Sequence, residues 1–473
     1  MGDIPQLVGL QTVKGQSSSP KELASAVHLE LLRRSANPPP LEIILELFES
    51  MYFASLKTEE SKPVLFHVVY LDPEKPDPKP PKTLVHNRWR CIQLFPSIAL
   101  NSPNFAKVAP ASDPRTSAFA VYPDVSGKLM VWGLIDQGNS YHDYVNFDSE
   151  SGPERPGLFQ ASITGTGHLI AYIGYEKIAE LRLNKLVRTA IDIFRSGKVR
   201  DSLETGIQTL VDSLRTGWPE EFPEAEDSDN WRMFVTDMWL TAVRRLLLRV
   251  QNIRHGGAFL VTPYQTNQGL LVKHKISYDR LRTALQRCAV ANAEQTISDE
   301  IIRNEYMEKD LEDMPVILHV DEVVAGYDLE EIRNELLGVV WFISLLTRVD
   351  GLVLLTPSLE VEGFGVEITE AEEPSEIYAA GDAWGTESFL RKLDYQQYGT
   401  RHRSMMRYCA KYPGSVGFVI SQDGDVRVMT HVEGRLIVWE NIQLQLPKFV
   451  GRRRFRRRRG RRVRRRPAAG SGL

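Results

Sequence analysis

The run of residues best suited to chemistry is Gly399-Thr400-Arg401-His402-Arg403, which opens a helical pattern. Two guanidiniums, an imidazole and the free backbone N–H groups at the start of a helix form an anion site suited to phosphates. Thr400 is available as the N-cap of that helix. Most basic clusters of this kind are solvated turns, so the residues alone leave open both a phosphate site and a solvated turn.

Asp350-Gly351 stands where a long helix is expected to give way to a strand over 352–356. A carboxylate at such a junction points from the end of the sheet, and sheet ends are where α/β proteins tend to place ligands. The same dipeptide is a common turn, so it indicates function only together with other residues.

Two further places complete the candidate set. Gly363-Phe364-Gly365 interrupts a β-forming run, either as a bulge or as backbone brought close to a flat ligand such as a base. Ser421 ends an expected strand ahead of a Gln-Asp-Gly turn. It is either part of a hairpin turn or a residue near phosphates or a metal.

The part of the chain that must hold these residues alternates strands and helices, which favours an α/β domain with one mixed sheet flanked by helices. We expect this domain at 231–446, with an insertion at about 291–335. The expected strands are 257–262, 270–275, 352–356, 360–368, 415–421, 425–431 and 435–439, and the expected helices are 231–251, 278–293, 298–313 and 329–347.

The preceding residues, 1–216, indicate an α+β domain, and the acidic, proline-containing stretch 217–230 is the best linker candidate. The expected helices of this first domain are 20–34, 41–56, 185–196 and 201–215, and its expected strands are 64–70, 89–94, 118–122, 129–135, 158–163 and 168–173.

The amino-acid composition is typical of a globular protein, except in the arginine-rich C-terminal residues. The 473 residues are 42% hydrophobic and 25% charged, and they suggest two or three domains. The net charge of −3 hides an asymmetry, because residues 451–473 contain twelve arginines and no acidic residue. The arginine-rich tail, 447–473, is too repulsive to fold alone. Nucleic acid, an anionic membrane surface and the acidic body remain open as its partners, as does a dispensable tail.

Cysteine content and hydropathy bear on location. Three widely separated cysteines argue against a disulfide framework or a zinc site. The longest apolar run, 336–346, is far shorter than a spanning helix needs, and no signal-peptide pattern is visible. We therefore expect a cytoplasmic protein without a transmembrane segment.

The order of these motifs resembles that of the diadenylate cyclase domain. In this chain an Asp-Gly strand, a glycine-containing strand, the unbroken Gly-Thr-Arg-His-Arg run and a strand ending in serine follow one another. The stretch 243–285 looks like the first half of that domain, and the resemblance covers about 232–445.

The resemblance implies a nucleotidyltransferase that condenses two ATP molecules into cyclic di-AMP with loss of two pyrophosphates. Two domains would face each other in a homodimer or a higher oligomer. It implies catalytic roles for Asp350, which would also position Mg²⁺ or Mn²⁺, and for Arg401, His402 and Arg403, which would hold the triphosphate. Six further residues would approach the nucleotide, namely Gly351, Leu352, Gly365, Gly399, Thr400 and Ser421.

Two departures from the family pattern keep an alternative open. Leu352 stands where the family usually has alanine, and the segment 365–399 is longer than usual and acidic. The alternative is a weakly active or inactive receptor of the same fold that binds ATP or a cyclic dinucleotide.

The N-terminal domain is similar to the predicted sensor region, of DACNV type, that stands beside some bacterial cyclases. The similarity is carried by the strands at 118–122, 132–134 and 167–173. It implies a domain that regulates the cyclase, and a docking domain without a ligand is the alternative.

Overall fold

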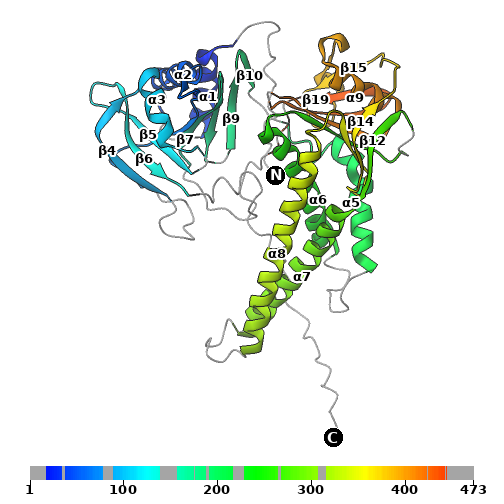
Figure 1. Cartoon of the computed structure of the whole chain (residues 1–473). Coiled ribbons are helices and arrows are strands. Elements are labelled where there is room, and N and C mark those ends of the chain that lie inside the picture. Colours follow the sequence, from blue (N-terminus) through cyan, green and yellow to red (C-terminus); the bar gives the residue numbers. More distant parts are fainter. Residues whose placement is uncertain are drawn as a thin grey trace.

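The computed structural model describes residues 18–34, 38–77, 89–114, 116–138, 157–174, 176–187, 191–216, 228–264, 268–306, 316–422, 424–440, 442 and 444. These residues form two large β-sheets, each with its own helices and hydrophobic core (Figure 1). The mixed character expected from the sequence is therefore confirmed, whereas the cyclase-like topology stays a prediction.

The first sheet is built from the N-terminal part of the chain. Its helices are α1 (Pro20–Arg34), α2 (Leu41–Ser55) and α3 (Ser102–Val108), and its strands are β3 (Phe66–Tyr70), β4 (Arg90–Ala99), β5 (Ser117–Pro123), β6 (Leu129–Asp136), β7 (Phe159–Gly165), β8 (His168–Ile173), β9 (Glu176–Arg182) and β10 (Lys185–Val187). The strand order is β10-β9-β8-β7-β3-β5-β6-β4, and only β3 and β5 pair in parallel. The helices cover one face, where Phe48, Phe66 and Phe119 are buried.

The second sheet has nine strands. The elements are α5 (Lys198–Thr216), α6 (Ser228–Ile253), β11 (Gly257–Val261), β12 (Leu270–Tyr278), α7 (Arg280–Tyr306), α8 (Val316–Leu346), β13 (Leu352–Leu355), β14 (Val361–Ile368), β15 (Ile377–Ala380), β16 (Leu390–Lys392), α9 (Thr400–Lys411), β17 (Val416–Ile420), β18 (Val426–Val432) and β19 (Arg435–Trp439). Their order is β12-β14-β13-β11-β17-β18-β19-β15-β16, with β11–β13 and β15–β19 parallel.

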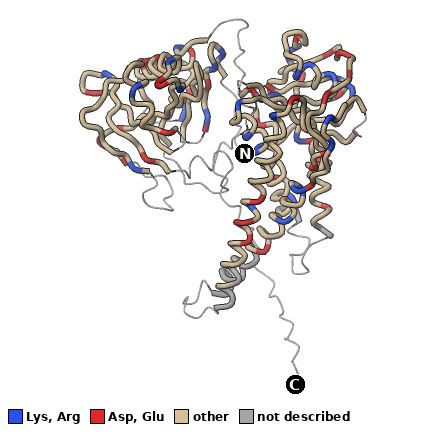
Figure 2. Tube along the Cα trace, viewed as in Figure 1, with Lys and Arg blue, Asp and Glu red and all other residues tan. Residues whose placement is uncertain are grey.

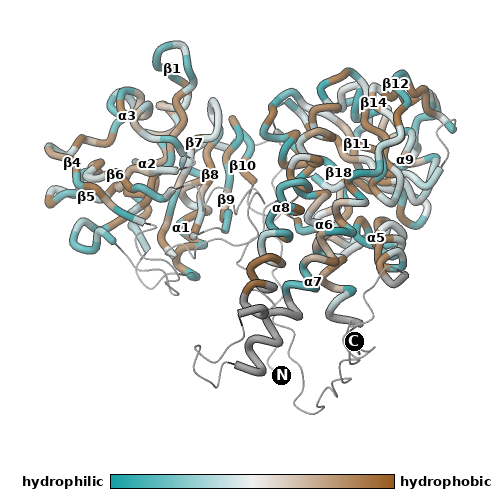
Figure 3. The backbone as a smooth tube through the Cα atoms, turned by 60° about the horizontal axis from the view of Figure 1, so that its bottom comes forward, coloured by the Kyte–Doolittle hydropathy of each residue, from teal (hydrophilic) through white to brown (hydrophobic). Residues whose placement is uncertain are grey.

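Helices cover both faces of this sheet. Helices α5 to α8 share a core with one face, in which Trp239 and Phe418 are buried. Helix α9 packs on the other face through Met405, Met406 and Tyr408. Because both faces are covered, β11, β13 and β17 are buried along their whole length, which explains why they are continuous apolar runs. Figure 3 shows hydrophobic segments running through both sheets and the helices against them.

The boundary between the two halves lies earlier than the sequence indicated. Helix α5 was expected to close the first domain, at residue 216, but it packs against the second sheet. Phe194 stacks on Phe418 with ring centroids 6.4 Å apart, and Arg244 pairs with Asp192 at 2.5 Å. Residues 191–216 therefore belong to the second core. The acidic stretch that we predicted as the linker runs between two helices of that core, and 217–227 lie outside the described residues.

Several local predictions were wrong. The helix expected over 185–196 is absent, because Lys185–Val187 pairs with β9 as an edge strand. The sequence also gave no sign of α3, β9, β15 or β16. Apolar spacing does not distinguish a short strand from a helical turn, and partner strands decide the outcome.

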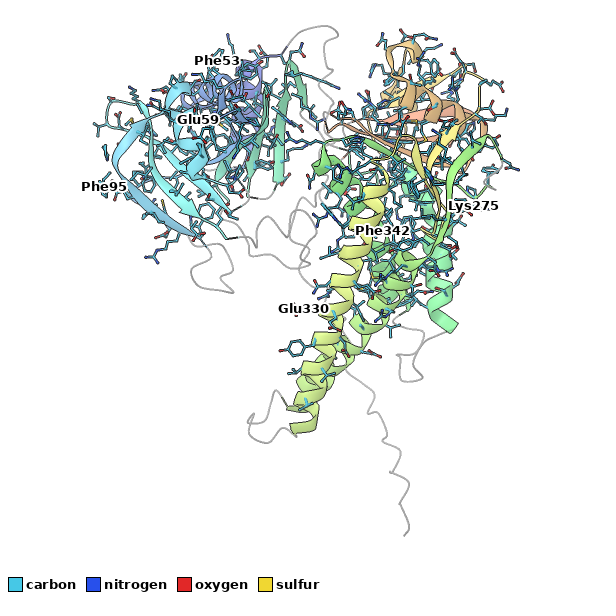
Figure 4. The ribbon with its side chains drawn as sticks, viewed as in Figure 1. Phe53, Glu59, Phe95, Lys275, Glu330 and Phe342 are labelled. Atoms are coloured by element: carbon cyan, nitrogen blue, oxygen red, sulfur yellow. The ribbon has the colours of Figure 1, made fainter. Side chains whose placement is uncertain are left out.

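Helices α7 and α8 form a long antiparallel hairpin that extends beyond the sheet (Figure 1). The insertion expected at about 291–335 falls on this hairpin, since α7 continues to Tyr306 and α8 begins at Val316. Its side chains include Glu330, which Figure 4 shows on α8 away from the sheet.

Figure 2 shows acidic and basic residues interspersed along both halves of the described chain. No helix within the described ranges is long and apolar enough to cross a membrane. The arginine-rich tail, 447–473, lies outside the described residues.

Candidate functional site

Several of the predicted site residues, among them Asp350, Gly351, Gly365 and Arg401, come together at one end of the second sheet. β11 and β13 both begin there, and β17 ends there, because Gly257 of β11 is paired with Ile420 of β17. Asp350 therefore lies at the amino ends of the two parallel strands.

Gly351 and Gly365 make the closest backbone approach at this end. A Cβ on Gly351 would lie only 2.5 Å from the carbonyl carbon of Gly365, and Gly351 has a φ of +116°. Only glycine combines that φ with that contact at low cost. The Gly363-Phe364-Gly365 run does contain an irregularity in its pairing with β13, so the bulge expected from the sequence is confirmed.

Asp350 and Arg401 face each other across this end of the sheet. Arg401 Nη2 lies 3.8 Å from Asp350 Oδ1, and the Asp350 side chain is 94% exposed. Arg401 also passes the turn before β11, since a Cβ on Gly256 would lie 3.2 Å from Arg401 Nη1. The structure thus places one carboxylate and one guanidinium side by side at a solvent-accessible position.

Helix α9 begins at Thr400, and its N-cap is Gly399 in an extended conformation. Thr400 was predicted as the cap, but it occupies the first helical position, and no side chain caps this end. The first backbone bond of the helix runs from Arg403 N to Gly399 O at 3.1 Å. The N–H groups of residues 400–402 therefore precede the helical ladder and can bind an anion.

The three side chains after Thr400 do not share one anion site. Arg401 points to Asp350, His402 Nε2 lies 3.0 Å from Arg427 Nη1, and Arg403 Nη1 donates to Gln396 Oε1 at 3.3 Å. Successive residues of an α-helix point about 100° apart, which a linear motif does not reveal. Of the three, Arg401 is the one that faces Asp350.

His402 is a half-buried imidazole. Burial, and next the charges of Arg427 and Arg401, lower its pKa from 6.5 to about 4. From the sequence His402 was grouped with Arg401 and Arg403 as a residue that would hold the triphosphate. The ring instead accepts a hydrogen bond from Arg427, which also pairs with Glu440 at 3.2 Å.

Ser421 forms part of a hairpin turn, one of the two roles considered for it. Its Oγ accepts a hydrogen bond from Asp425 N at 3.0 Å, and its N–H donates to Asp425 O at 2.8 Å. The turn lies beside Arg401, because Gln422 N is 3.3 Å from the position of a Cβ on Gly256. Ser421 therefore shapes the wall of the site.

Neither Leu352 nor the acidic segment after Gly365 obstructs this end of the sheet. Leu352 is 4% exposed and its side chain belongs to the core shared with α9, so only its backbone borders the site. The longer segment after Gly365 adds β15 and β16 at the far edge of the sheet, with four strands between β13 and β15. Acidic side chains of this segment pair with nearby basic side chains, such as Glu370 with Lys411 at 2.8 Å.

Sequence analysis missed His274. It stacks on Phe364 with ring centroids 4.8 Å apart, and its Cδ2 lies 3.2 Å from where a Cβ on Gly365 would be. His274 is exposed and Phe364 is half-buried, and the pair gives Gly365 an aromatic neighbour of the kind on which nucleobases stack. His274 faces Phe364 through strand pairing, so no local signal could have found it.

A divalent metal fits this site only together with a phosphate ligand. Among the described residues no group of three or more His, Cys, Asp or Glu side chains gathers around one point. Asp350 nevertheless presents an exposed carboxylate, and Mg²⁺ characteristically binds one or two carboxylates plus substrate phosphates. Asp350 could therefore hold Mg²⁺ or Mn²⁺ that arrives with a triphosphate.

Comparison with known proteins bears on the first sheet. A family model described as a probable sensor domain, DACNV, matches residues 33–136. Those residues are similar to a probable sensor domain. The match spans α2 to β6, and the predicted likeness is thereby confirmed over these residues, whereas the strand at 167–173 lies outside the match. None of the curated proteins and none of the solved structures compared matches this chain.

Proposed function

We propose that the chain is a diadenylate cyclase regulated by its N-terminal sensor domain. In this reaction the 3′-hydroxyl of each ATP attacks the α-phosphorus of the other. Two P–O bonds form, two bonds to pyrophosphate break, and each hydroxyl loses its proton. The products are cyclic di-AMP and two pyrophosphates.

The observation that carries the proposal is the meeting of Asp350, Arg401 and the start of α9 at one end of the sheet. Arg401 and the free N–H groups of α9 would bind the triphosphate, since both are suited to phosphate oxygens. The paired glycines 351 and 365 would let a nucleoside approach the backbone. Positioning and charge neutralisation supply most of the catalysis in phosphoryl transfer.

The Asp350 carboxylate would orient the attacking 3′-hydroxyl and hold Mg²⁺ or Mn²⁺ brought by the triphosphate. When bound, the metal supplies neutralisation of phosphate charge. Arg403 and His402 would hold the first turn of α9 in position, because Arg403 contacts Gln396 and His402 contacts Arg427.

The proposal requires two copies of the chain. A site with one Arg401 and one α9 start holds one ATP, so the second ATP must come from a facing domain. We therefore propose a homodimer or a higher homo-oligomer as the active form.

Incubation of the purified protein with ATP and Mg²⁺ or Mn²⁺, followed by mass spectrometry of the products, tests the proposal. We expect the wild type to form cyclic di-AMP and Asp350→Asn to form at least a hundredfold less. The magnitude follows from the loss of one key electrostatic group in an active site. Asp328→Asn, on the exposed face of α8, is the matched control and should retain activity.

An absence of product together with ATP binding that depends on Arg401 would favour the receptor of the same fold. In that function the chain would hold ATP or a cyclic dinucleotide and signal through the sensor domain. An absence of both product and binding would reject both functions.

We further propose that the arginine-rich tail binds a polyanion, either nucleic acid or an anionic membrane surface. Twelve arginines without a compensating acid favour binding through phosphate charge. Deleting 451–473 should abolish binding to duplex DNA or RNA, and binding by the intact chain should fall steeply with salt. Binding that persists after the deletion would contradict this assignment, and binding only to anionic vesicles would select the membrane surface.

A further inference from the structure

Side-chain contacts made by Arg254 and Arg182 join the two sheets in the described part of the chain. Arg254, in the turn between α6 and β11, donates from Nη2 to the backbone oxygen of Thr164 in β7. Arg182 of β9 forms an ion pair with Asp425, in the turn between β17 and β18. Thr164 and Arg182 lie at the same end of the first sheet, where β7, β8 and β9 pair with one another. Figure 1 shows β9 and β10 as the strands of the first sheet nearest the second.

Both contacted turns border Arg401. Arg254 stands two residues before Gly256, against which Arg401 lies, and it has a left-handed φ of +55°. Asp425 exchanges two hydrogen bonds with Ser421, in the turn whose next residue also approaches Gly256. Contact from the first sheet therefore reaches the candidate site through two turns that meet at Gly256.

Asp425 also connects to the first turn of α9. Its Oδ2 lies 3.5 Å from Arg427 Nη2, and Arg427 Nη1 contacts His402 at 3.0 Å. His402 directly follows Arg401, so the pair across the two sheets belongs to the network that supports the helix start. The side chains of Arg182 and Asp425 are 20% and 26% exposed, which limits screening by solvent.

The first sheet holds Arg182 in place. Glu180 on the same strand is 1% exposed and contacts His168 at 2.5 Å, Lys177 at 2.6 Å and Arg182. Burial alone would raise the pKa of this carboxyl, but its basic neighbours lower it well below the usual value. The charged carboxylate thus fixes the guanidinium that reaches Asp425.

We propose that this docking contact, made by Arg182 and Arg254, sets the position of Arg401 and the first turn of α9, so that changes in the first sheet alter nucleoside triphosphate binding at the candidate site. The ligand in this inference rests on the proposed function, whereas the docking contact does not. Such coupling requires only that the docked and the undocked arrangements of the two sheets bind the nucleoside triphosphate with different affinities.

The test uses the full-length protein and measures the Kd for ATP with Mg²⁺ by calorimetry. Arg182→Gln should raise the Kd about fivefold or more, the lower end of typical allosteric coupling. Asp425→Asn, which also weakens the pair with Arg427, should do the same. The double variant should bind no more weakly than Asp425→Asn alone, because both changes remove the same Arg182–Asp425 contact. Arg90→Gln, on β4 at the opposite edge of the first sheet, is the matched control and should leave the Kd unchanged.

Amide hydrogen exchange provides a second measurement that does not depend on ATP. In Arg182→Gln the turn between β17 and β18 should exchange faster than in the wild type and in Arg90→Gln. If the exchange rate of this turn is unchanged in Arg182→Gln, the inference is overturned. It is also overturned if Arg182→Gln and Asp425→Asn have additive effects on the Kd for ATP. If the wild type binds no ATP, the proposed function fails, and faster exchange would still establish the docking contact.

Discussion

The neighbouring side chains Asp350, Arg401 and His402 differ in their surroundings at the end of the second sheet. Asp350 is almost fully exposed and Arg401 reaches it, whereas His402 is turned toward Arg427. The Arg-His-Arg run therefore combines an arginine beside an exposed carboxylate with a half-buried histidine bonded to another arginine, and their chemistry should differ accordingly.

The pKa of His402 predicts a pH-dependent stability. The unfolded state takes up a proton near pH 6.5 and the folded state only near pH 4, so stability is complete above about pH 6.5 and is lost as the pH falls. Between about pH 7 and pH 5 the folded protein should lose about 2 kcal/mol through this group. Chemical denaturation at both pH values should show a smaller loss for His402→Gln.

The matched control for this prediction is His431→Gln, at a half-buried position in β18. Its loss of stability between pH 7 and pH 5 should exceed that of His402→Gln. An equal acid loss in the wild type and in His402→Gln would show that His402 does not titrate in this range.

Gly351, just before β13, and Gly365, within β14, approach each other closely through their backbones. A methyl group on Gly351 would meet the backbone of Gly365 at 2.5 Å while φ stays at +116°. Gly351→Ala should therefore cost about 3 kcal/mol, the upper range for strained backbone, and lower the melting temperature measured by calorimetry.

Gly434→Ala is the control that separates the cost of a positive φ from the cost of the backbone contact. Gly434 also has a positive φ, of +86°, but a Cβ there would meet nothing within 4 Å. This control should cost about 1 kcal/mol. Equal costs at the two positions would mean that the backbone contact between Gly351 and Gly365 does not constrain the sheet.

The arrangement of the two halves also yields a prediction about where the chain can be divided. Six apolar side chains of α5 are buried against the second sheet, namely Val199, Leu203, Ile207, Leu210, Val211 and Leu214. Each contributes about 1.5–3 kcal/mol on burial, so their sum is comparable with the net stability of a domain. A fragment 191–446 should unfold cooperatively in thermal circular dichroism, whereas 231–446 should not. Equal melting temperatures would contradict the assignment of α5 to the second core.

Local sequence determined the elements that are long, strongly periodic or clearly bounded. Helices α1 and α2 and strands β11, β13 and β17 lie where the sequence predicted them, because apolar runs and flanking proline or glycine are local signals. The motif around Asp350 and Arg401 was likewise visible as residue types in order. The roles proposed for those residues stay predictions.

The tertiary structure alone decided which of these residues meet. Arg401 and not His402 faces Asp350, because helical rotation and the partner Arg427 orient the side chains. His274 joins the site through strand pairing with β14, and α5 joins the second core through contacts far away in sequence. Contacts of this kind depend on the register of strands and the packing of faces, which a single sequence does not encode locally.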